Sequence, residues 1–394
     1  MPLTIRATLI AAVLAAGATA ATAQAATPQI HAHRGGTVVN GKPTFAEETL
    51  SAYRSAAANG FVLEVDAKLT SDGVPVAIHD ATLDRTTTCT GEVRSFTLAA
   101  LRSCRPDVLG SPGGGLRTSQ VSPSGSIATI AEVLELARLT GAKVNLEIKN
   151  LPTDPDWDPT SAYANRVMDV VVAAGLPRSQ LLIQSFIPAN LDVAKRRMPR
   201  VPTSLLTLSA GSDTVKFASD NGYDWISPQW PVTPGFVAGA HRAHHPVAPY
   251  TLNARADVRA AARAKVDALI TDDPLMAAGA LGLRPVRALH VGLNRRAGRV
   301  EVSGRLRLPA GVSPRKGCTG VVTLRLLGPK RLLHTERVRL TRDCLFKLGG
   351  PVPRRAPARL LATIGFGGNK RLLPRLVGPR PVPPDQPLAV PHAG

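Results

Sequence analysis

Two carboxylates and two histidines stand at the ends of short apolar runs early in this 394-residue chain. Glu64 and Asp66 alternate within one such run, so both side chains project from the same face of a strand. A turn then leads into a second apolar run that ends at His79, and an earlier run ends in His33-Arg34. Three strand ends therefore supply the groups needed to hold a divalent cation and to move protons around a phosphate.

The acidic residues favour a cation site over a solvated strand edge. Glu64 and Asp66 lie inside the apolar stretch from Val62 to Leu69, where a carboxylate would be costly to bury without a partner. Glu147 lies near the end of a later apolar run, Lys143–Ile148, and is a third carboxylate of this kind. Such hard oxygen ligands suit Ca²⁺ or Mg²⁺ better than a softer metal.

The order and spacing of these residues resemble the glycerophosphodiester phosphodiesterase family over roughly residues 28 to 280. The matching segments are His33-Arg34-Gly35, Glu47-Glu48-Thr49, Glu64-Val65-Asp66, Thr70-Ser71-Asp72-Gly73 through His79-Asp80, Leu146-Glu147-Ile148-Lys149, Gln184-Ser185-Phe186, Thr251-Leu252-Asn253 and Ile270-Thr271-Asp272-Asp273-Pro274. The chain departs from the family pattern at Glu48, where asparagine is usual, and this adds negative charge near the expected site.

The resemblance implies metal-dependent hydrolysis of glycerophosphodiesters to sn-glycerol 3-phosphate and an alcohol. His33 and His79 would be the general acid and base, in an order that the sequence leaves open. The nucleophile would be water or a neighbouring hydroxyl of the substrate. The residues expected around them are Arg34 and Lys149 at the phosphate, Glu64, Asp66 and Glu147 at one Ca²⁺ or Mg²⁺ ion, and Glu47, Gln184 and Asn253 as further support of the metal or the pocket.

Two other functions remain open from the sequence. A phospholipase D-like relative on the same fold would cleave the head groups of lysophospholipid or sphingomyelin, and it would need a wider, more apolar lip around the site. A non-catalytic protein that binds the cell envelope would keep the barrel shell without turnover.

The pattern between residues 30 and 282 predicts an α/β fold, a (β/α)₈ TIM barrel. Short, continuously apolar runs alternate with amphipathic helical stretches, of which the first is Glu47–Asn59, as expected when helices cover both faces of the strands. The run Val74–His79 is expected as a hairpin-like addition outside the barrel. The barrel strands are expected at Ile30–His33, Phe61–Leu69, Lys143–Ile148, Gln180–Phe186, Thr203–Leu208, Asp224–Ser227, Val247–Leu252 and Ala268–Thr271.

The last part of the chain differs in composition. Residues 281–394 contain 23 Lys and Arg against 4 Asp and Glu, so they hold nearly all of the formal net charge of +20. Short alternating apolar and basic segments predict a small all-β, sandwich-like domain. Its charge suggests an anionic envelope polymer or lipid surface as partner. Nucleic acid is disfavoured because Phe346 and Phe366 are its only aromatic residues.

The beginning of the chain has the pattern of a secretory signal, so a secreted or envelope-associated protein is expected, with no transmembrane segment after cleavage. The spacing of the four cysteines favours disulfides Cys89–Cys104 and Cys318–Cys344. The predicted organisation is a signal peptide at 1–26, the barrel at 27–282 with a disulfide-bearing, Gly/Pro-rich insertion at about 85–126, a basic β-rich domain at 283–373 and a Pro-rich tail at 374–394.

Overall fold

The computed structural model describes residues 27–109, 117–121, 126–329, 331–353 and 359–385. The predicted signal peptide, parts of the insertion and the last residues of the Pro-rich tail lie outside the described residues. In the described ranges, no helix combines the length and the apolar character that crossing a membrane requires.

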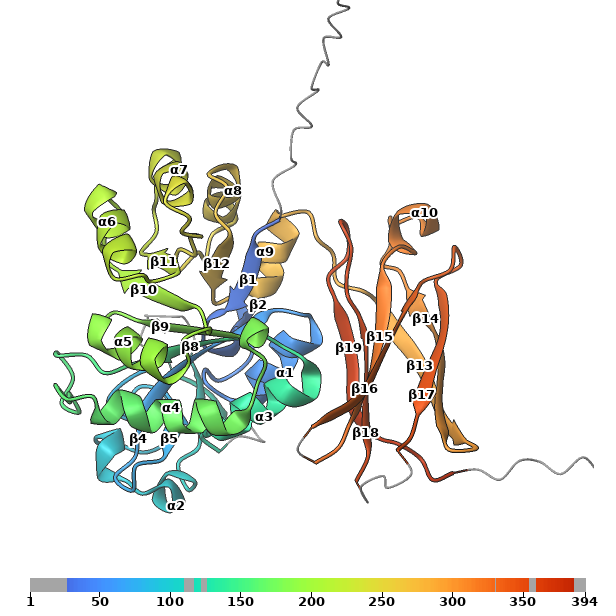
Figure 1. The fold of residues 1–394 in the computed structure, drawn as a ribbon, viewed down its shortest axis with the longest axis horizontal. Coiled ribbons are helices and arrows are strands. Elements are labelled where there is room, and N and C mark those ends of the chain that lie inside the picture. The colour runs from blue at the N-terminus through green and yellow to red at the C-terminus, as the bar shows by residue number, and fades with distance from the viewer. Residues whose placement is uncertain (1–26, 110–116, 122–125, 330, 354–358, 386–394) are drawn as a thin grey trace, which may run out of the picture.

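Within the described residues, seven parallel strands form one sheet in the order β11-β10-β9-β8-β4-β1-β12 (Figure 1). The strands are β1 (Gln29–Ala32), β4 (Val62–Leu69), β8 (Val144–Ile148), β9 (Leu181–Ser185), β10 (Thr203–Thr207), β11 (Trp225–Pro228) and β12 (Ala268–Thr271). Most of their residues are buried on both faces, which explains the continuous apolar runs.

The segment 246–252 closes the sheet into a barrel. The Ala248 amide donates to the Ile226 carbonyl of β11 at 3.0 Å, and the Leu252 amide donates to the Ile270 carbonyl of β12 at 2.9 Å. The continuous strand expected at Val247–Leu252 is replaced by isolated bridges, because Pro249 has no amide to donate. This segment takes the position of the eighth strand, and the predicted (β/α)₈ barrel is confirmed.

Eight helices of the described residues surround this sheet: α1 (Leu50–Ala58), α3 (Ile130–Thr140), α4 (Ala162–Ala174), α5 (Pro188–Arg197), α6 (Ser212–Asp220), α7 (Pro234–Arg242), α8 (Arg255–Arg263) and α9 (Pro274–Ala280). Helix α1 begins later than expected because Thr49 caps it, accepting from the Ala52 amide. Glu47 and Glu48 are thereby left in the preceding loop, where they reach the barrel mouth.

An addition with its own small core covers one side of the mouth. Its strand β5 (Pro75–Ala77) pairs antiparallel with β4, which confirms the predicted hairpin. The other elements of the addition are α2 (Leu98–Leu101), β6 (Asp107–Leu109) and β7 (Arg117–Val121). Two short strands, β2 (Val38–Val39) and β3 (Lys42–Pro43), lie between β1 and α1. The predicted disulfide Cys89–Cys104 is formed, with an S–S distance of 2.06 Å.

The C-terminal part is an all-β sandwich with a separate apolar core. It extends past the predicted boundary at residue 373, because residues 375–381 of the predicted Pro-rich tail form its last strand and pair with Leu361–Phe366. One sheet has three strands in the order β13-β14-β17 and the other has four in the order β16-β15-β18-β19. The elements are β13 (Ala288–Arg296), β14 (Arg299–Arg307), α10 (Pro314–Gly317), β15 (Val321–Leu327), β16 (Leu332–Arg339), β17 (Leu345–Pro351), β18 (Leu361–Phe366) and β19 (Arg375–Pro381). The predicted disulfide Cys318–Cys344 links α10 to the start of β17.

The four-stranded sheet lies against the barrel beside α1 and α3 (Figure 1). The Thr363 hydroxyl donates to the Leu139 carbonyl at 2.9 Å, and the Arg325 guanidinium donates to the Arg138 carbonyl at 3.1 Å. Both carbonyls belong to the C-terminal end of α3, which lies at the amino ends of the barrel strands. The sandwich therefore sits away from the carboxyl ends, where barrel enzymes build their active sites.

Candidate active site

The carboxyl ends of the barrel strands and the loops that follow them carry the residues singled out in the sequence. Of the predicted catalytic, phosphate-binding, metal-binding and supporting residues, all except Asp66 line one of two pockets, of about 380 Å³ and about 560 Å³. His33, Arg34 and His79 line both pockets. The two pockets therefore meet at the histidines and the arginine, which is the arrangement needed to cut a substrate with a group on each side of its phosphate.

The three predicted metal ligands come together from two neighbouring strands. Asp66 on β4 lies opposite Glu147 on β8, and Glu64 precedes Asp66 by one pleat of the same face. One carboxylate oxygen from each residue lies within 4.8 Å of the others. Glu64 is 2% exposed, Asp66 1% and Glu147 4%, so these carboxyl groups are held out of water.

The hydrogen bonds of this cluster leave room for a cation. Asp66 Oδ2 is buried and accepts no hydrogen bond from the residues that the structure describes. The Glu64 oxygens are oriented by the Gln184 side-chain amide at 2.9 Å and by the Arg34 backbone amide at 2.8 Å. An all-oxygen donor set with an unsatisfied buried carboxylate fits a hard divalent cation.

The protonation of the cluster points the same way. Burial, helped by the Asp66 charge, raises the pKa of Glu64 well above its usual value. Burial also raises the pKa of Glu147 to about 7, although Lys149 opposes the shift. Burial likewise acts against ionised Asp66, but Lys149 and other nearby cations hold the pKa of Asp66 below its usual range. A bound cation would remove the repulsion that the raised values express.

Arg34 connects the cluster to the first histidine through a tight turn after β1. Its backbone is left-handed, with φ of 51°, which directs its amide to Glu64. A Cβ on the next residue, Gly35, would lie 2.7 Å from the Ala52 Cβ, so only glycine fits beneath the turn. Arg34 Nε lies 3.6 Å from Asp66 Oδ2 and makes no hydrogen bond to a described residue. Arg34 lines both pockets, so its guanidinium can reach a phosphoryl oxygen bound there.

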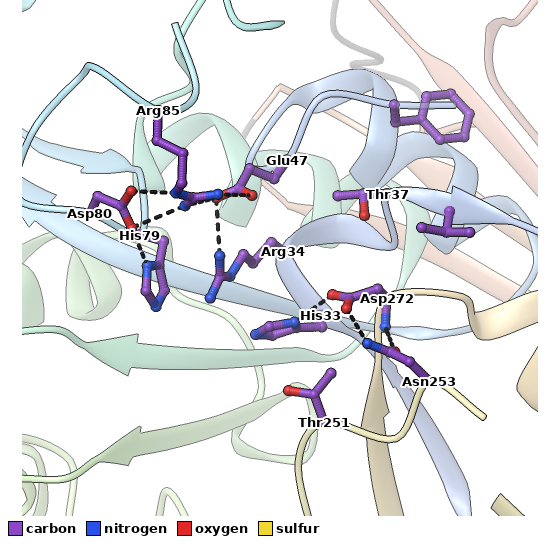
Figure 2. Close-up of a pocket in the computed structure, with 12 residues that line it drawn as sticks. His33, Arg34, Thr37, Glu47, His79, Asp80, Arg85, Thr251, Asn253 and Asp272 are labelled. Atoms are coloured by element: carbon purple, nitrogen blue, oxygen red, sulfur yellow. Dashed lines mark hydrogen bonds and ion pairs between the residues drawn. The ribbon is translucent and has the colours of Figure 1, made fainter. Parts of the chain in front are cut away.

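His33 is held by a carboxylate with a neutral partner. Its Nδ1 lies 2.6 Å from Asp272 Oδ1, and the other Asp272 oxygen accepts from the Asn253 side-chain amide at 2.5 Å (Figure 2). Although burial opposes ionisation, His33 holds the pKa of Asp272 below its usual value. The second ring nitrogen of His33 remains for proton exchange with a substrate.

His79 is held by a carboxylate with a charged partner. Its Nδ1 lies 2.5 Å from Asp80 Oδ1, and the Arg85 guanidinium donates to both Asp80 oxygens, at 2.5 and 3.0 Å (Figure 2). Arg85 also forms a two-point ion pair with Glu47, at 2.7 and 2.9 Å. Burial lowers the pKa of His79 to about 4, although Asp66 and Asp80 act in the opposite direction. His79 is thus neutral at neutral pH and can accept a proton.

The supporting residues have more specific positions than the sequence could define. Glu47 pairs with Arg34 and Arg85 and is not part of the acidic cluster. Gln184 orients Glu64, and Asn253 orients Asp272.

Sequence reasoning did not assign roles to Asp80, Asp272 or Arg85. Asp80 and Asp272 belong to the matched segments, and this membership was the available signal. Arg85 follows His79 within the same loop, but nothing in its spacing indicates that it contacts Glu47 from another loop.

Glu48, the departure from the family pattern, is also placed. It is 3% exposed and accepts hydrogen bonds from the Tyr53 hydroxyl and from the Asp66 amide, the latter at 3.1 Å. Burial and the charges of Asp66 and Glu64 raise the pKa of Glu48 well above its usual value. The raised pKa favours the neutral form of Glu48, in which this side chain would support the β4 backbone without adding to the charge of the metal cluster.

The site has a cluster of carboxyl groups that could hold a cation and two histidines that each contact an aspartate, all at the carboxyl ends of the barrel strands. These features define a hydrolase of the phosphodiesterase class. The model of the Glycerophosphoryl diester phosphodiesterase family matches residues 33–276. The chain belongs to this family, whose members are enzymes that hydrolyse phosphoric diesters.

Individual relatives agree with the family assignment. A glycerophosphodiester phosphodiesterase of Caldanaerobacter subterraneus subsp. tengcongensis is 27% identical over 248 residues, which cover 62% of this chain and 93% of that protein. A crystal structure from Silicibacter pomeroyi is similar with a TM-score of 0.56 at 25% identity, covering 64% of this chain and 92% of that one. An Oleispira antarctica phosphodiesterase, solved in complex with the product sn-glycerol-3-phosphate, has a TM-score of 0.52 at 23% identity, with coverages of 65% and 97%.

Proposed function

We propose that this protein hydrolyses glycerophosphodiesters to sn-glycerol 3-phosphate and an alcohol with one bound divalent cation, Ca²⁺ or Mg²⁺. The observation that carries the proposal is the convergence of His33, His79 and Arg34 where the two pockets meet. The activity named for the Caldanaerobacter relative supports the same substrate class.

The phosphate would be bound between the cluster and the basic residues. A cation held by Glu64, Asp66 and Glu147 would neutralise charge on the phosphoryl oxygens. Arg34, which lines both pockets, would donate from its guanidinium to one of these oxygens. Lys149, whose ammonium lies 3.1 Å from Glu147, would add a second positive charge. These groups stabilise the additional negative charge that develops as the phosphorus is attacked.

The two histidines would divide the proton transfers. Neutral His79 takes the proton from the attacking oxygen, because burial keeps its pKa low. The bond between phosphorus and the alcohol oxygen then breaks, and His33 delivers a proton to that oxygen. We assign the acid role to His33 because the other side-chain hydrogen-bond partner of its aspartate, Asp272, is the neutral Asn253, whereas Asp80 beside His79 is bound to the cationic Arg85.

The test is release of glycerol 3-phosphate from glycerophosphocholine by the full-length mature protein. We expect turnover that is lost after chelation, restored by Ca²⁺ or Mg²⁺, and abolished by His79→Ala. Absence of turnover in a folded, metal-loaded protein would contradict the proposal and favour the alternative in which the site cleaves the head groups of lysophospholipid or sphingomyelin.

One observation favours a second substrate class, a lysophospholipid cleaved at its head group. The larger of the two pockets has apolar side chains at its mouth that are not buried, namely Leu151, Phe186 and Leu208, which form an apolar lip. Leu208 is 75% exposed, more than any other large apolar side chain of the described residues. An exposed leucine at the mouth of a polar site suits a substrate that carries an acyl chain.

This second activity can be tested with a matched pair of variants. Leu208→Ser should lower kcat/KM for lysophosphatidylcholine by about 10-fold, because one well-placed apolar contact contributes this much, and leave glycerophosphocholine unaffected. Val172→Ser removes an exposed apolar side chain of α4, outside both pockets, and should change neither activity. Equal rates of lysophospholipid cleavage in the unmodified protein and in both variants would exclude a role for the apolar lip in binding this substrate.

We further propose that the protein is exported and works at the cell envelope on glycerophosphate-containing lipids or polymers. The leader-like residues 1–26 and the pairing of all four cysteines support export. Fractionation of cells, followed by mass determination of the mature amino terminus, tests this proposal. A cytoplasmic protein with an intact first segment would contradict it.

A further inference from the structure

The outer face of the three-stranded sheet β13-β14-β17 is not used by the fold of the sandwich. Its strands alternate strictly: Val300, Val302 and Leu306 of β14 point into the core, whereas the residues between them are exposed or partly exposed. The opposite sheet of the sandwich contacts the barrel through hydrogen bonds, whereas no hydrogen bond or ion pair to the barrel is recorded from the described residues of this face. The face is available to a partner.

This face carries a surplus of positive charge. Its exposed cations, none of which forms an ion pair within the described residues, are Arg296, Arg299, Arg305, Arg307 and Lys347. Arg296 lies directly opposite Arg299 on the neighbouring strand, an arrangement that repulsion disfavours in the absence of an anion. Glu301 is the only carboxylate on the three strands.

A hollow of about 750 Å³ opens within the charged face. Gly292, an exposed residue of β13 that pairs with Ser303 of β14, leaves the space because it has no side chain to fill it. Its polar lining consists of groups that can donate hydrogen bonds to an anion, namely His290, Ser303, Arg305, Thr341 and Lys347, and the described lining includes no carboxylate. Arginine, lysine and hydroxyl donors around a shallow space are suited to a phosphate group.

We propose that this hollow binds a phosphodiester group of a linear glycerophosphate polymer and that the surrounding arginines bind the neighbouring repeats. The choice of polymer rests on the proposed function, because the same repeating unit is the substrate class assigned to the barrel. The binding surface itself rests only on the charge and shape of the sandwich.

The composition of the face favours a polymer over a lipid bilayer. Leu345, at 40% exposure, is the one large apolar side chain of these strands that stands exposed in the described structure. Membrane-surface binding commonly combines basic residues with several aromatic or aliphatic side chains that enter the bilayer. A flat row of arginines without such side chains matches repeated phosphates in water.

The experiment measures retention of the full-length mature protein on immobilised poly(glycerol phosphate) at low salt. The test variant is Arg305→Ser/Lys347→Ser, which removes two cations from the hollow. The control is Arg259→Ser/Lys265→Ser, which removes one exposed arginine and one exposed lysine from the barrel, neither with a recorded ion pair. Both variants lose the same charge, so non-specific attraction falls equally in the two.

We expect polymer affinity to fall by about 10-fold or more in the hollow variant and by less than about 2-fold in the control, since two charge-assisted contacts are lost in one and none in the other. Hydrolysis of glycerophosphocholine should be unchanged in both, which separates this inference from the proposed function. Equal losses in the two variants would overturn it. Loss of binding to vesicles of phosphatidylglycerol and phosphatidylcholine, with polymer retention unchanged, would also overturn it and identify a lipid surface instead.

Discussion

The two histidines of the active site have similar first partners and different second partners. His33 contacts Asp272 at 2.6 Å and His79 contacts Asp80 at 2.5 Å. Behind Asp272 stands the neutral amide of Asn253, whereas behind Asp80 stands the guanidinium of Arg85. The His33 pair is also more enclosed, with side-chain exposures of 16% and 7% against 26% and 26%.

This difference shows how one site can set two identical side chains to opposite tasks. A carboxylate whose charge is not neutralised stabilises a protonated histidine, and one that already has a cation does so less. The acid and base roles therefore depend on the residue behind each aspartate. The matched segments specify both histidines but do not distinguish their partners.

The largest expected effects come from removing the histidines themselves. His33→Ala and His79→Ala should each lower kcat/KM for glycerophosphocholine by about 10³-fold, a typical contribution of general acid–base catalysis. With a nitrophenyl diester of glycerol phosphate, whose leaving group needs no proton, only the loss in His79→Ala should persist. If His33→Ala instead lost as much activity with this substrate as with glycerophosphocholine, the assigned acid and base roles would be reversed. Comparing kcat/KM of each variant with the two substrates distinguishes these results.

Neutralising the aspartates should separate the two pairs. Asp272→Asn should lower kcat by about 10²-fold, because it removes the charge that stabilises protonated His33. Asp80→Asn should lower kcat by only about 10-fold, because Arg85 already neutralises the charge that this change removes. Thermal unfolding serves as the control for folding. Equal losses in the two variants would show that both aspartates only orient their histidines.

Arg85→Gln should shift the pH profile rather than abolish activity. Without the guanidinium, Asp80 stabilises protonated His79 and raises its pKa. The acid limb of kcat/KM, which reports deprotonation of His79, then moves to higher pH by about 1 unit. A profile displaced to lower pH, or not displaced, would contradict the assignment of Arg85 as a neutralising group. Arg85→Lys, which keeps the charge, should move the limb less.

Glu48→Gln should have the smallest effect, less than about 3-fold on kcat/KM. The raised pKa of Glu48 keeps this side chain protonated, so an amide of similar shape replaces a neutral group. A large loss would show that Glu48 is ionised and contributes charge to the cation cluster. Activity and cation affinity, measured by titration after chelation, distinguish these results.

The barrel and the sandwich could be predicted because each follows from local periodicity, and the acidic cluster could be predicted because its residues belong to segments that resemble the family pattern. Glu64 and Asp66 share a face of β4 by strand geometry alone, and parallel pairing brings Glu147 beside them. The contact of Arg85 with Glu47 depends instead on how two loops pack, which no local pattern encodes. The segment 246–252, which closes the barrel, was expected to be a regular strand but forms only isolated bridges, because prolines interrupt its hydrogen bonding.

The position of the sandwich has a consequence for how an anchored enzyme would cut. The four-stranded sheet of the sandwich covers the barrel end where Gln29 and Lys143 lie, and the three-stranded basic sheet faces away from the barrel. A polymer bound to the basic sheet would therefore be separated from the mouth of the barrel by both sheets, which pack about 10 Å apart, and by the length of the barrel. The segment being held cannot be the segment being cleaved. Such an enzyme would trim neighbouring strands of a dense polymer layer within reach of its tether, while its own attachment point stays intact.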